Sequence, residues 1–295
     1  MTNNQSFDLS ALTRPSGAFA MLALDQRETM RAMFAERQQA PVSDEQIVEF
    51  KLSALRTLSP LASAVLIDRD FAWNRAVQEG VTAPNCSLIA AADRFYSSGD
   101  EIVARAEIDD RIAPAELREQ GAKALKLLVI WRPDESPEAR VAMVDQFVSR
   151  CRQAGLISII EPVSRQARDG RATDTQKGIL AAARELGNRG QDLYKSEVPL
   201  HAQGEENDIR RQCAELTQLI RSPWVVLSSG VLPDRFPMAV RWACQEGARG
   251  FLAGRAIWKN AIAAADPLTA LQTDSRDRLK RLCDVVDEAV APATA

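Results

Sequence analysis

The segment over residues 192–200, DLYKSEVPL, has the apolar residues of a β-strand but carries a lysine and a glutamate inside it. Side chains of a strand alternate between its two faces, so Leu193, Lys195 and Glu197 share one face. A strand in the middle of a sheet is buried on both faces, where uncompensated charges cost free energy. These charged residues therefore indicate chemistry at this strand.

A buried lysine is well suited to form an imine with a carbonyl compound. Its amine is nucleophilic only when neutral, and burial together with a second cation favours the neutral form. Lys126 lies inside another apolar run, and Glu161 falls on the same strand face as Ile157 and Ile159. A carboxyl group beside the imine can carry the protons that the carbinolamine exchanges. A protonated imine accepts the electrons of a breaking carbon–carbon bond, which is the logic of a class I aldolase.

Further polar residues follow the apolar runs at their carboxyl ends, where the active sites of α/β barrels lie. Asp25 ends the first run and joins Lys195, Glu161 and Lys126 as a candidate catalytic residue. Candidate substrate-binding residues are Gln26 and Arg27, which follow Asp25 at the end of the first run, and Asp68 at the end of the second. Any one of these charges could instead belong to an ion pair that stabilises the fold. The set as a whole favours function, because a barrel core can be built from apolar residues alone.

The last two apolar runs are followed by small residues that are typical of a phosphate site. In α/β barrels, loop amides and a helix N-terminus hold the anion at this place, and an arginine adds a bidentate donor. The residues concerned are Ser228, Ser229, Gly230, Gly254 and Arg255. Gly254 taken alone is equally well explained by the close packing of a helix.

Eight short apolar runs would position these residues. They cover residues 19–25, 62–68, 87–93, 124–131, 157–163, 192–198, 224–230 and 250–255. The runs start roughly 25 to 45 residues apart, which leaves room for a crossover helix each time. Eight such units in 295 residues predict an α/β protein with one domain over residues 1–295, a closed (β/α)8 TIM barrel. A doubly wound sheet is the alternative, but the first run is not followed by GxGxxG.

Helix signals between the runs agree with a barrel. Ser43 and Gln46 form a predicted capping box at the start of one helix. A terminal helix over about residues 275–289 and the N-terminal segment 1–18 are expected to pack on the barrel. The polar loop over residues 165–174 is the best candidate for a lid.

Composition restricts the classes of function. The formal net charge of −3 gives no general attraction to nucleic acid or to an anionic membrane. No apolar run approaches the ~20 residues that span a bilayer, and the N-terminus lacks the pattern of a signal peptide, so a cytoplasmic protein is expected. Five cysteines without a CxxC pair suggest core residues. The one histidine, His201, argues against a histidine-rich metal site and is expected to face solvent in a loop.

Six segments carry a resemblance to a known family: FAMLALDQRE, ALKLLVIWR, ISIIEPV, DLYKSEVPL, WVVLSSGV and GFLAGRAIW. They resemble class I aldolases of the tagatose-1,6-bisphosphate aldolase family, and within it the sulfoglycolytic branch of 6-deoxy-6-sulfofructose-1-phosphate aldolases. The resemblance implies that Lys195 forms the Schiff base and that Lys126, Glu161 and Asp25 transfer protons. It also implies a homo-oligomer, a dimer or a tetramer, without metal or other cofactor. At Ser196 the relatives carry an apolar residue.

The leading hypothesis is a lyase of sulfoquinovose degradation. It would cleave 6-deoxy-6-sulfofructose 1-phosphate to dihydroxyacetone phosphate and 3-sulfolactaldehyde. One alternative is the same chemistry on tagatose or fructose 1,6-bisphosphate. A second is a non-catalytic sugar-phosphate sensor, which would need no imine and therefore fits the lysine and carboxylate set less well. Neither nucleic acid nor membrane is expected as a partner.

Overall fold

The computed structural model describes residues 7–290 and contains a closed barrel of eight parallel strands. Around the barrel the strand order is β1-β10-β9-β8-β7-β6-β3-β2. The strands are β1 (Phe19–Leu24), β2 (Ala64–Ile67), β3 (Ser87–Ala91), β6 (Ala122–Trp131), β7 (Ile157–Ser164), β8 (Leu193–Ser196), β9 (Trp224–Val226) and β10 (Gly250–Ala253). Each overlaps one of the eight apolar runs, so the predicted TIM barrel is confirmed. Residues 1–6 of the expected N-terminal segment lie outside the described residues.

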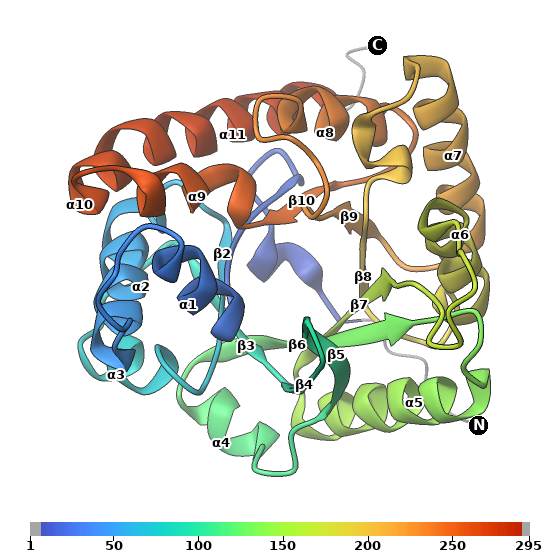
Figure 1. The fold of residues 1–295 in the computed structure, drawn as a ribbon, viewed down its shortest axis with the longest axis horizontal. Helices are drawn as coiled ribbons and strands as arrows, with labels where there is room; N and C mark the ends of the chain where they lie inside the picture. The colour runs from blue at the N-terminus through green and yellow to red at the C-terminus, as the bar shows by residue number, and fades with distance from the viewer. Residues whose placement is uncertain (1–6, 291–295) are drawn as a thin grey trace.

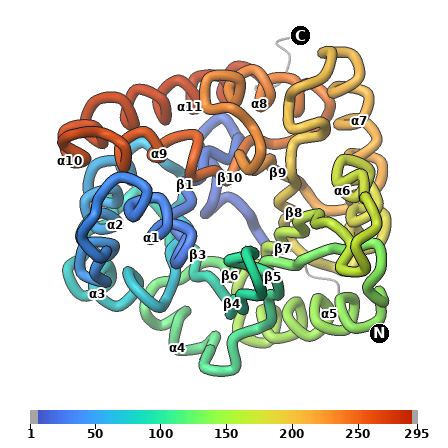
Figure 2. Tube along the Cα trace, viewed as in Figure 1, coloured from blue at the N-terminus to red at the C-terminus, as the bar shows by residue number. Residues whose placement is uncertain are grey.

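Helices form an outer ring around the strands (Figure 1), and Figure 2 follows the chain as it winds around the barrel. The α-helices are α1 (Glu28–Ala35), α2 (Asp44–Leu58), α3 (Trp73–Gln78), α4 (Pro114–Glu119), α5 (Pro137–Ala154), α6 (Thr175–Leu186), α7 (Glu206–Leu219), α8 (Phe236–Gln245), α9 (Arg255–Ala263), α10 (Pro267–Ala270) and α11 (Arg276–Val290). Short turns of other helix types are η1 (Leu9–Leu12), η2 (Pro199–Ala202) and η3 (Leu271–Ser275). The predicted terminal helix corresponds to α11.

At the start of α2, one of the two hydrogen bonds of the predicted capping box forms. The hydroxyl of Ser43 accepts a hydrogen bond of 3.1 Å from the backbone N–H of Gln46. The side chain of Gln46 does not return the bond and pairs with the side chain of Gln38 instead. The prediction of the helix start is correct, whereas the reciprocal bond is replaced by a tertiary contact.

Apolar side chains fill the amino-terminal half of the barrel interior. The buried cluster there consists of Leu12, Phe19, Met21, Ala23, Ala64, Leu66, Ile89, Ala91, Ala124, Ile157, Ile159, Leu193, Val225 and Leu252. Because a strand repeats every two residues, the next inward position after each cluster member faces the same interior. That step leads from Ala23, Ala124, Ile159 and Leu193 to Asp25, Lys126, Glu161 and Lys195, respectively. The charged residues therefore lie directly above the apolar layer, at the carboxyl ends of the strands.

An antiparallel hairpin that the sequence did not predict follows β3. It consists of β4 (Asp93–Ser98) and β5 (Glu101–Ile108), and Figure 1 shows it beside β3 and β6. The run over residues 87–93 was expected to be one strand, but β3 ends at Ala91 and Asp93 already belongs to the hairpin. Arg132 ties the hairpin to the loop over residues 165–174, because its guanidinium bonds both Glu101, at 2.6 Å, and the backbone carbonyl of Gln166.

Candidate active site

The ammonium group of Lys126 lies among three carboxylates at the centre of the barrel. Its Nζ atom is 2.6 Å from Asp25, 2.8 Å from Asp93 and 3.1 Å from Glu161. The lysine side chain is fully buried, and so is Asp93. A buried ammonium is stable there only because the surrounding carboxylates and their hydrogen bonds compensate for its lost hydration.

Glu161 connects this cluster to Lys195. One carboxylate oxygen of Glu161 is 2.8 Å from Nζ of Lys195, while the other is 3.1 Å from Nζ of Lys126. Lys195 is almost completely buried. A carboxylate is therefore within proton-transfer distance of the amine that would form an imine.

The charges of the cluster stabilise one another. Burial by itself would lower the pKa of Lys126, but the carboxylates of Asp25, Asp93 and Glu161 outweigh it and raise the pKa well above the ordinary value. Burial would likewise raise the pKa of Asp25, and the ammonium groups of Lys126 and Lys195 outweigh it, so that the pKa lies well below the ordinary range. Lys126 is thus held as a cation and Asp25 as an anion.

A cavity of about 340 Å³ opens above these groups at the carboxyl end of the barrel. Its lining includes Asp25 and Glu161 from the cluster, together with Gln26, Ser229, Arg165 and Arg255. Among the described residues, no carboxylate lies within ion-pair distance of Arg165 or Arg255. Burial lowers the pKa of Arg255, although Glu161 acts in the opposite direction and Arg165 adds to the lowering. The two guanidinium groups are available to an anionic ligand.

The small residues after β9 and β10 are arranged around the N-terminus of α9. The hydroxyl of Ser228 accepts a weak hydrogen bond of 3.4 Å from the backbone N–H of Ala256. Gly254 precedes α9, and a Cβ atom there would lie 2.3 Å from the carbonyl oxygen of Ala23. Gly254 therefore permits close approach of the backbone to β1, while Gly230 adopts a positive φ of 77° in the loop after β9.

Two candidate substrate-binding residues are engaged by other protein groups. Arg27 donates to the carboxylate and to the carbonyl oxygen of Asp93, both at 2.9 Å, and its guanidinium lies 4.4 Å from the ring centroid of Phe95. Asp68 is completely buried, pairs with Lys51 of α2 and accepts a bond from the N–H of Phe71. Asp68 is absent from the cavity lining because an ion pair with α2 occupies its carboxylate.

Other residues of the site were not identified from the sequence. In the sequence, Asp93 is the last residue of the apolar run over residues 87–93, and Arg165 is the first residue of the polar loop over residues 165–174. The hairpin contributes Asp100 and Glu101 to the cavity lining. A signal for the hairpin exists, since Ser98-Gly99 is a turn dipeptide followed by apolar residues at every second position from Ile102 to Ile108.

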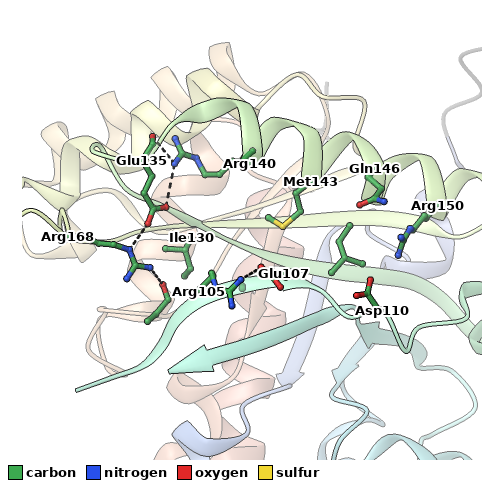
Figure 3. A pocket seen from close by; sticks show the side chains of 14 residues that line it. Arg105, Glu107, Asp110, Ile130, Glu135, Arg140, Met143, Gln146, Arg150 and Arg168 are labelled. Atoms are coloured by element: carbon green, nitrogen blue, oxygen red, sulfur yellow. Dashed lines mark hydrogen bonds and ion pairs between the residues drawn. The ribbon is translucent and has the colours of Figure 1, made fainter. Parts of the chain in front are cut away.

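A second hollow lies outside the barrel, between β5 and α5, and Figure 3 shows its side chains. Three of its arginines are paired with carboxylates, and one of them, Arg105, pairs with Glu107 within β5. Arg168 contacts Glu135 at 2.7 Å and donates to the carbonyl oxygen of Ala104 in the hairpin, while Arg140 pairs with Glu185. These contacts anchor the loop over residues 165–174, the lid candidate, to the hairpin and to the start of α5.

Two further properties concern the described residues only. Within residues 7–290, no group of three or more His, Cys, Asp and Glu side chains is arranged to hold a metal ion. No helix in the same part of the chain combines the length and the apolar character needed to cross a membrane.

Comparisons with known proteins give a family for the chain and relatives for its fold. Residues 19–260 match the family model described as DeoC/LacD family aldolase. The chain is 25% identical to a tagatose 1,6-diphosphate aldolase of Listeria monocytogenes, over 99% of this chain and 94% of the relative. It is 26% identical to tagatose 1,6-diphosphate aldolase 2 of Enterococcus faecalis, over 97% and 94% of the two chains. The crystal structure of an archaeal fructose 1,6-bisphosphate aldolase superimposes with a TM-score of 0.64 at 13% identity, covering 95% of this chain and 98% of that chain, which shows the shared fold.

Proposed function

The chain belongs to the DeoC/LacD family of aldolases, and on this premise we propose that Lys195 forms a Schiff base with 6-deoxy-6-sulfofructose 1-phosphate. As an aldolase the protein is a lyase. The products would be dihydroxyacetone phosphate and 3-sulfolactaldehyde. The observation that carries the proposal is Glu161, which bridges the ammonium groups of Lys195 and Lys126 at 2.8 and 3.1 Å beside a cavity with two arginines.

The proposed reaction begins when Glu161 accepts a proton from the ammonium group of Lys195, 2.8 Å away, and the neutral Nζ attacks the C2 carbonyl of the ketose. Glu161 donates a proton to the hydroxyl of the carbinolamine, water leaves, and a protonated imine forms. Glu161, now a carboxylate, accepts the proton of the C4 hydroxyl, and the electrons of the C3–C4 bond move into the imine as the aldehyde departs. Glu161 then gives this proton to C3 of the enamine, and hydrolysis of the imine releases dihydroxyacetone phosphate and free Lys195. Lys126 holds Asp25 and Glu161 in position through these steps.

The charges around the cavity support a sulfonate at the distal end of the substrate. A sulfonate carries one negative charge, whereas a phosphate carries nearly two at neutral pH. The arginines of the cavity are Arg165 and Arg255, and the hairpin adds the acidic residues Asp100 and Glu101. Glu101 is paired with Arg132, but Asp100 is exposed and has no ion-pair partner among the described residues. One phosphate and one anion of lower charge suit this lining better than two phosphates.

We expect the sulfonated substrate to be preferred over tagatose 1,6-bisphosphate. Its kcat/KM should be higher by at least about tenfold, a difference of ~1.4 kcal/mol in transition-state binding. The measurement is a competition assay in which both ketoses are present and both aldehyde products are quantified. Removing the charge in an Asp100→Asn variant should narrow the ratio of the two kcat/KM values. Asp110→Asn, at an exposed position after β5 that does not line the cavity, serves as the control. An equal or reversed preference in the unmodified protein would favour the bisphosphate.

The second candidate is therefore a tagatose or fructose 1,6-bisphosphate aldolase of the same mechanism. It is supported by the relatives from Listeria monocytogenes and Enterococcus faecalis, which carry the name tagatose 1,6-diphosphate aldolase. The catalytic residues would be the same, and only the ligand of the distal anion site would differ. The hypothesis of a non-catalytic sensor is not retained, because the family and its named relatives are aldolases.

Arg255, with the loop residues Ser228, Ser229, Gly230 and Gly254, is proposed to hold the C1 phosphate. The Arg255→Ala variant should bind dihydroxyacetone phosphate about ten- to hundredfold more weakly, because one charge-assisted contact worth roughly 1.5–3 kcal/mol is lost. Isothermal titration calorimetry with dihydroxyacetone phosphate measures this difference. An Arg281→Ala variant, changed on the exposed side of α11, is the matched control. Equal affinity of the Arg255 variant and the unmodified protein would contradict the assignment.

The remaining proposals concern the protein as a whole. We propose that residues 1–295 form one catalytic domain and that the enzyme works as a homo-oligomer, a dimer or a tetramer, in the cytoplasm. The single closed barrel supports the first statement, and the resemblance to the family supports the others. Light scattering coupled to size-exclusion chromatography would measure the number of subunits.

A further inference from the structure

The turn that follows the strand of Lys195 has an unusual backbone. Leu200, His201 and Ala202 have positive φ angles of 54°, 46° and 55°, and none of them is glycine. The left-handed region is disfavoured for residues with a Cβ atom, so three successive cases persist only where surrounding contacts fix them. Such backbone is found preferentially at functional sites.

The contacts that fix the turn converge on the imidazole of His201. A Cβ atom built on Gly230 would lie 2.7 Å from Cγ and Cδ2 of the histidine, so the ring lies directly against this glycine. The Nδ1 atom of His201 is 3.0 Å from Nε2 of Gln176 in α6. The other ring nitrogen, Nε2 of His201, is 3.6 Å from a carboxylate oxygen of Glu197. The side chain is only 24% exposed, so the prediction of a solvent-facing loop residue is wrong.

His201 follows β8 and contacts the loop after β9, and Glu197 extends these contacts to the end of β7. Its second carboxylate oxygen accepts a hydrogen bond of 2.8 Å from the backbone N–H of Ser164, the last residue of β7. Ser164 immediately precedes Arg165, which lines the cavity, and Glu197 lies two residues beyond Lys195. Glu197 and His201 thus link the ends of β7 and β8 to the loop after β9.

We propose that His201 is a positioning residue that fixes the loop of Gly230 relative to Lys195. This inference rests on the proposed function, because it assigns the backbone around Gly230 to the phosphate site. The histidine does not touch the reacting atoms in this scheme. It keeps the amides that receive the phosphate at a constant place relative to the amine that attacks C2, and the 3.0 Å contact with Gln176 holds the imidazole in turn.

The test is a comparison of steady-state constants for an His201→Asn variant. Asparagine tolerates the left-handed backbone, but its shorter side chain reaches neither Glu197 nor Gln176. Phosphate binding contributes equally to the ground state and the transition state, so KM should rise about tenfold while kcat changes less than about threefold. The control is Gln203→Ala in the same turn, which changes an exposed side chain. An unchanged KM, or a fall in kcat alone, would overturn the proposal.

A double-mutant cycle keeps the inference testable if the single variant is poorly folded. The Gly230→Ala substitution introduces a methyl group that collides with the imidazole, and the His201→Asn substitution removes that collision. The loss in kcat/KM caused by Gly230→Ala should therefore be at least about threefold smaller in the His201→Asn background. Equal losses in both backgrounds would refute direct coupling. If the unmodified protein cleaves neither ketose phosphate, the proposed function fails, and binding of inorganic phosphate to the same four proteins still measures the coupling.

Discussion

The Lys195→Ala variant should lose at least about 10⁴-fold in kcat/KM, because removal of a covalent nucleophile leaves only substrate binding and the remaining polar groups. The fold should survive, since alanine leaves Glu161 paired with Lys126 at 3.1 Å. Circular dichroism and the unfolding midpoint provide the check on folding. The loss would then be a chemical effect rather than a structural one.

Borohydride trapping identifies the amine directly. Reduction in the presence of dihydroxyacetone phosphate should place one stable adduct on the peptide that contains Lys195, as mapped by mass spectrometry. The adduct should be absent from Lys195→Ala and unchanged in Lys177→Ala, whose lysine is 87% exposed on α6. An adduct on Lys126, or full activity of Lys195→Ala, would show that another amine forms the imine.

The Lys126→Met variant should be both inactive and strongly destabilised. Methionine fills much of the volume of the lysine but leaves Asp25, Asp93 and Glu161 without their shared cation. Breaking a buried ion pair by removing one partner typically costs about 3–5 kcal/mol of unfolding free energy. Activity should fall because Glu161 and Asp25 lose the group that holds them in position.

The loss of unfolding free energy in the Lys126→Met variant should depend on pH in a defined direction. Because the pKa of Asp25 is lowered by folding, its contribution to stability is present above about pH 4, the ordinary pKa, and is lost as the pH falls further. Because the pKa of Lys126 is raised, its contribution is present below about pH 10.4 and is lost at higher pH. Without Lys126 the carboxylate of Asp25 loses the main cause of its lowered pKa and takes up a proton more readily. The destabilisation relative to the unmodified protein should therefore be smaller at pH 5 than at pH 7, by ~1.4 kcal/mol for each unit by which the pKa of Asp25 in the variant exceeds 5.

Urea unfolding at the two pH values measures this difference. The double variant Lys126→Met/Asp93→Asn removes one charge of each sign and should recover part of the lost stability. Arg241→Ala, which breaks an exposed pair with Glu288, should cost no more than about 1 kcal/mol and serves as the reference. A destabilisation that is equal at pH 5 and pH 7 would contradict the electrostatic explanation.

The sequence alone was sufficient for the barrel and for the inward lysines. Each barrel strand is a short apolar run, and its two-residue repeat is a local property that needs no knowledge of the partner strands. The same repeat places Lys126, Glu161 and Lys195 above the apolar layer formed by Ala124, Ile159 and Leu193. The start of α2 was also predictable, because its cap involves residues only three positions apart.

Tertiary structure decided which of these charges meet and what else enters the site. Asp93 contacts Lys126, which lies 33 residues away in the sequence. Lys51, on a helix outside the ring of strands, forms an ion pair with Asp68. A local pattern shows that a residue is charged and faces inward, but the identity of its partner depends on closure of the barrel and on the path of the loops. The hairpin and the left-handed turn at His201 have the same origin. Both are fixed by contacts with distant segments, through Arg132 for the hairpin and through Gly230 and Gln176 for the turn. The free energy of such contacts cannot be read from the local sequence.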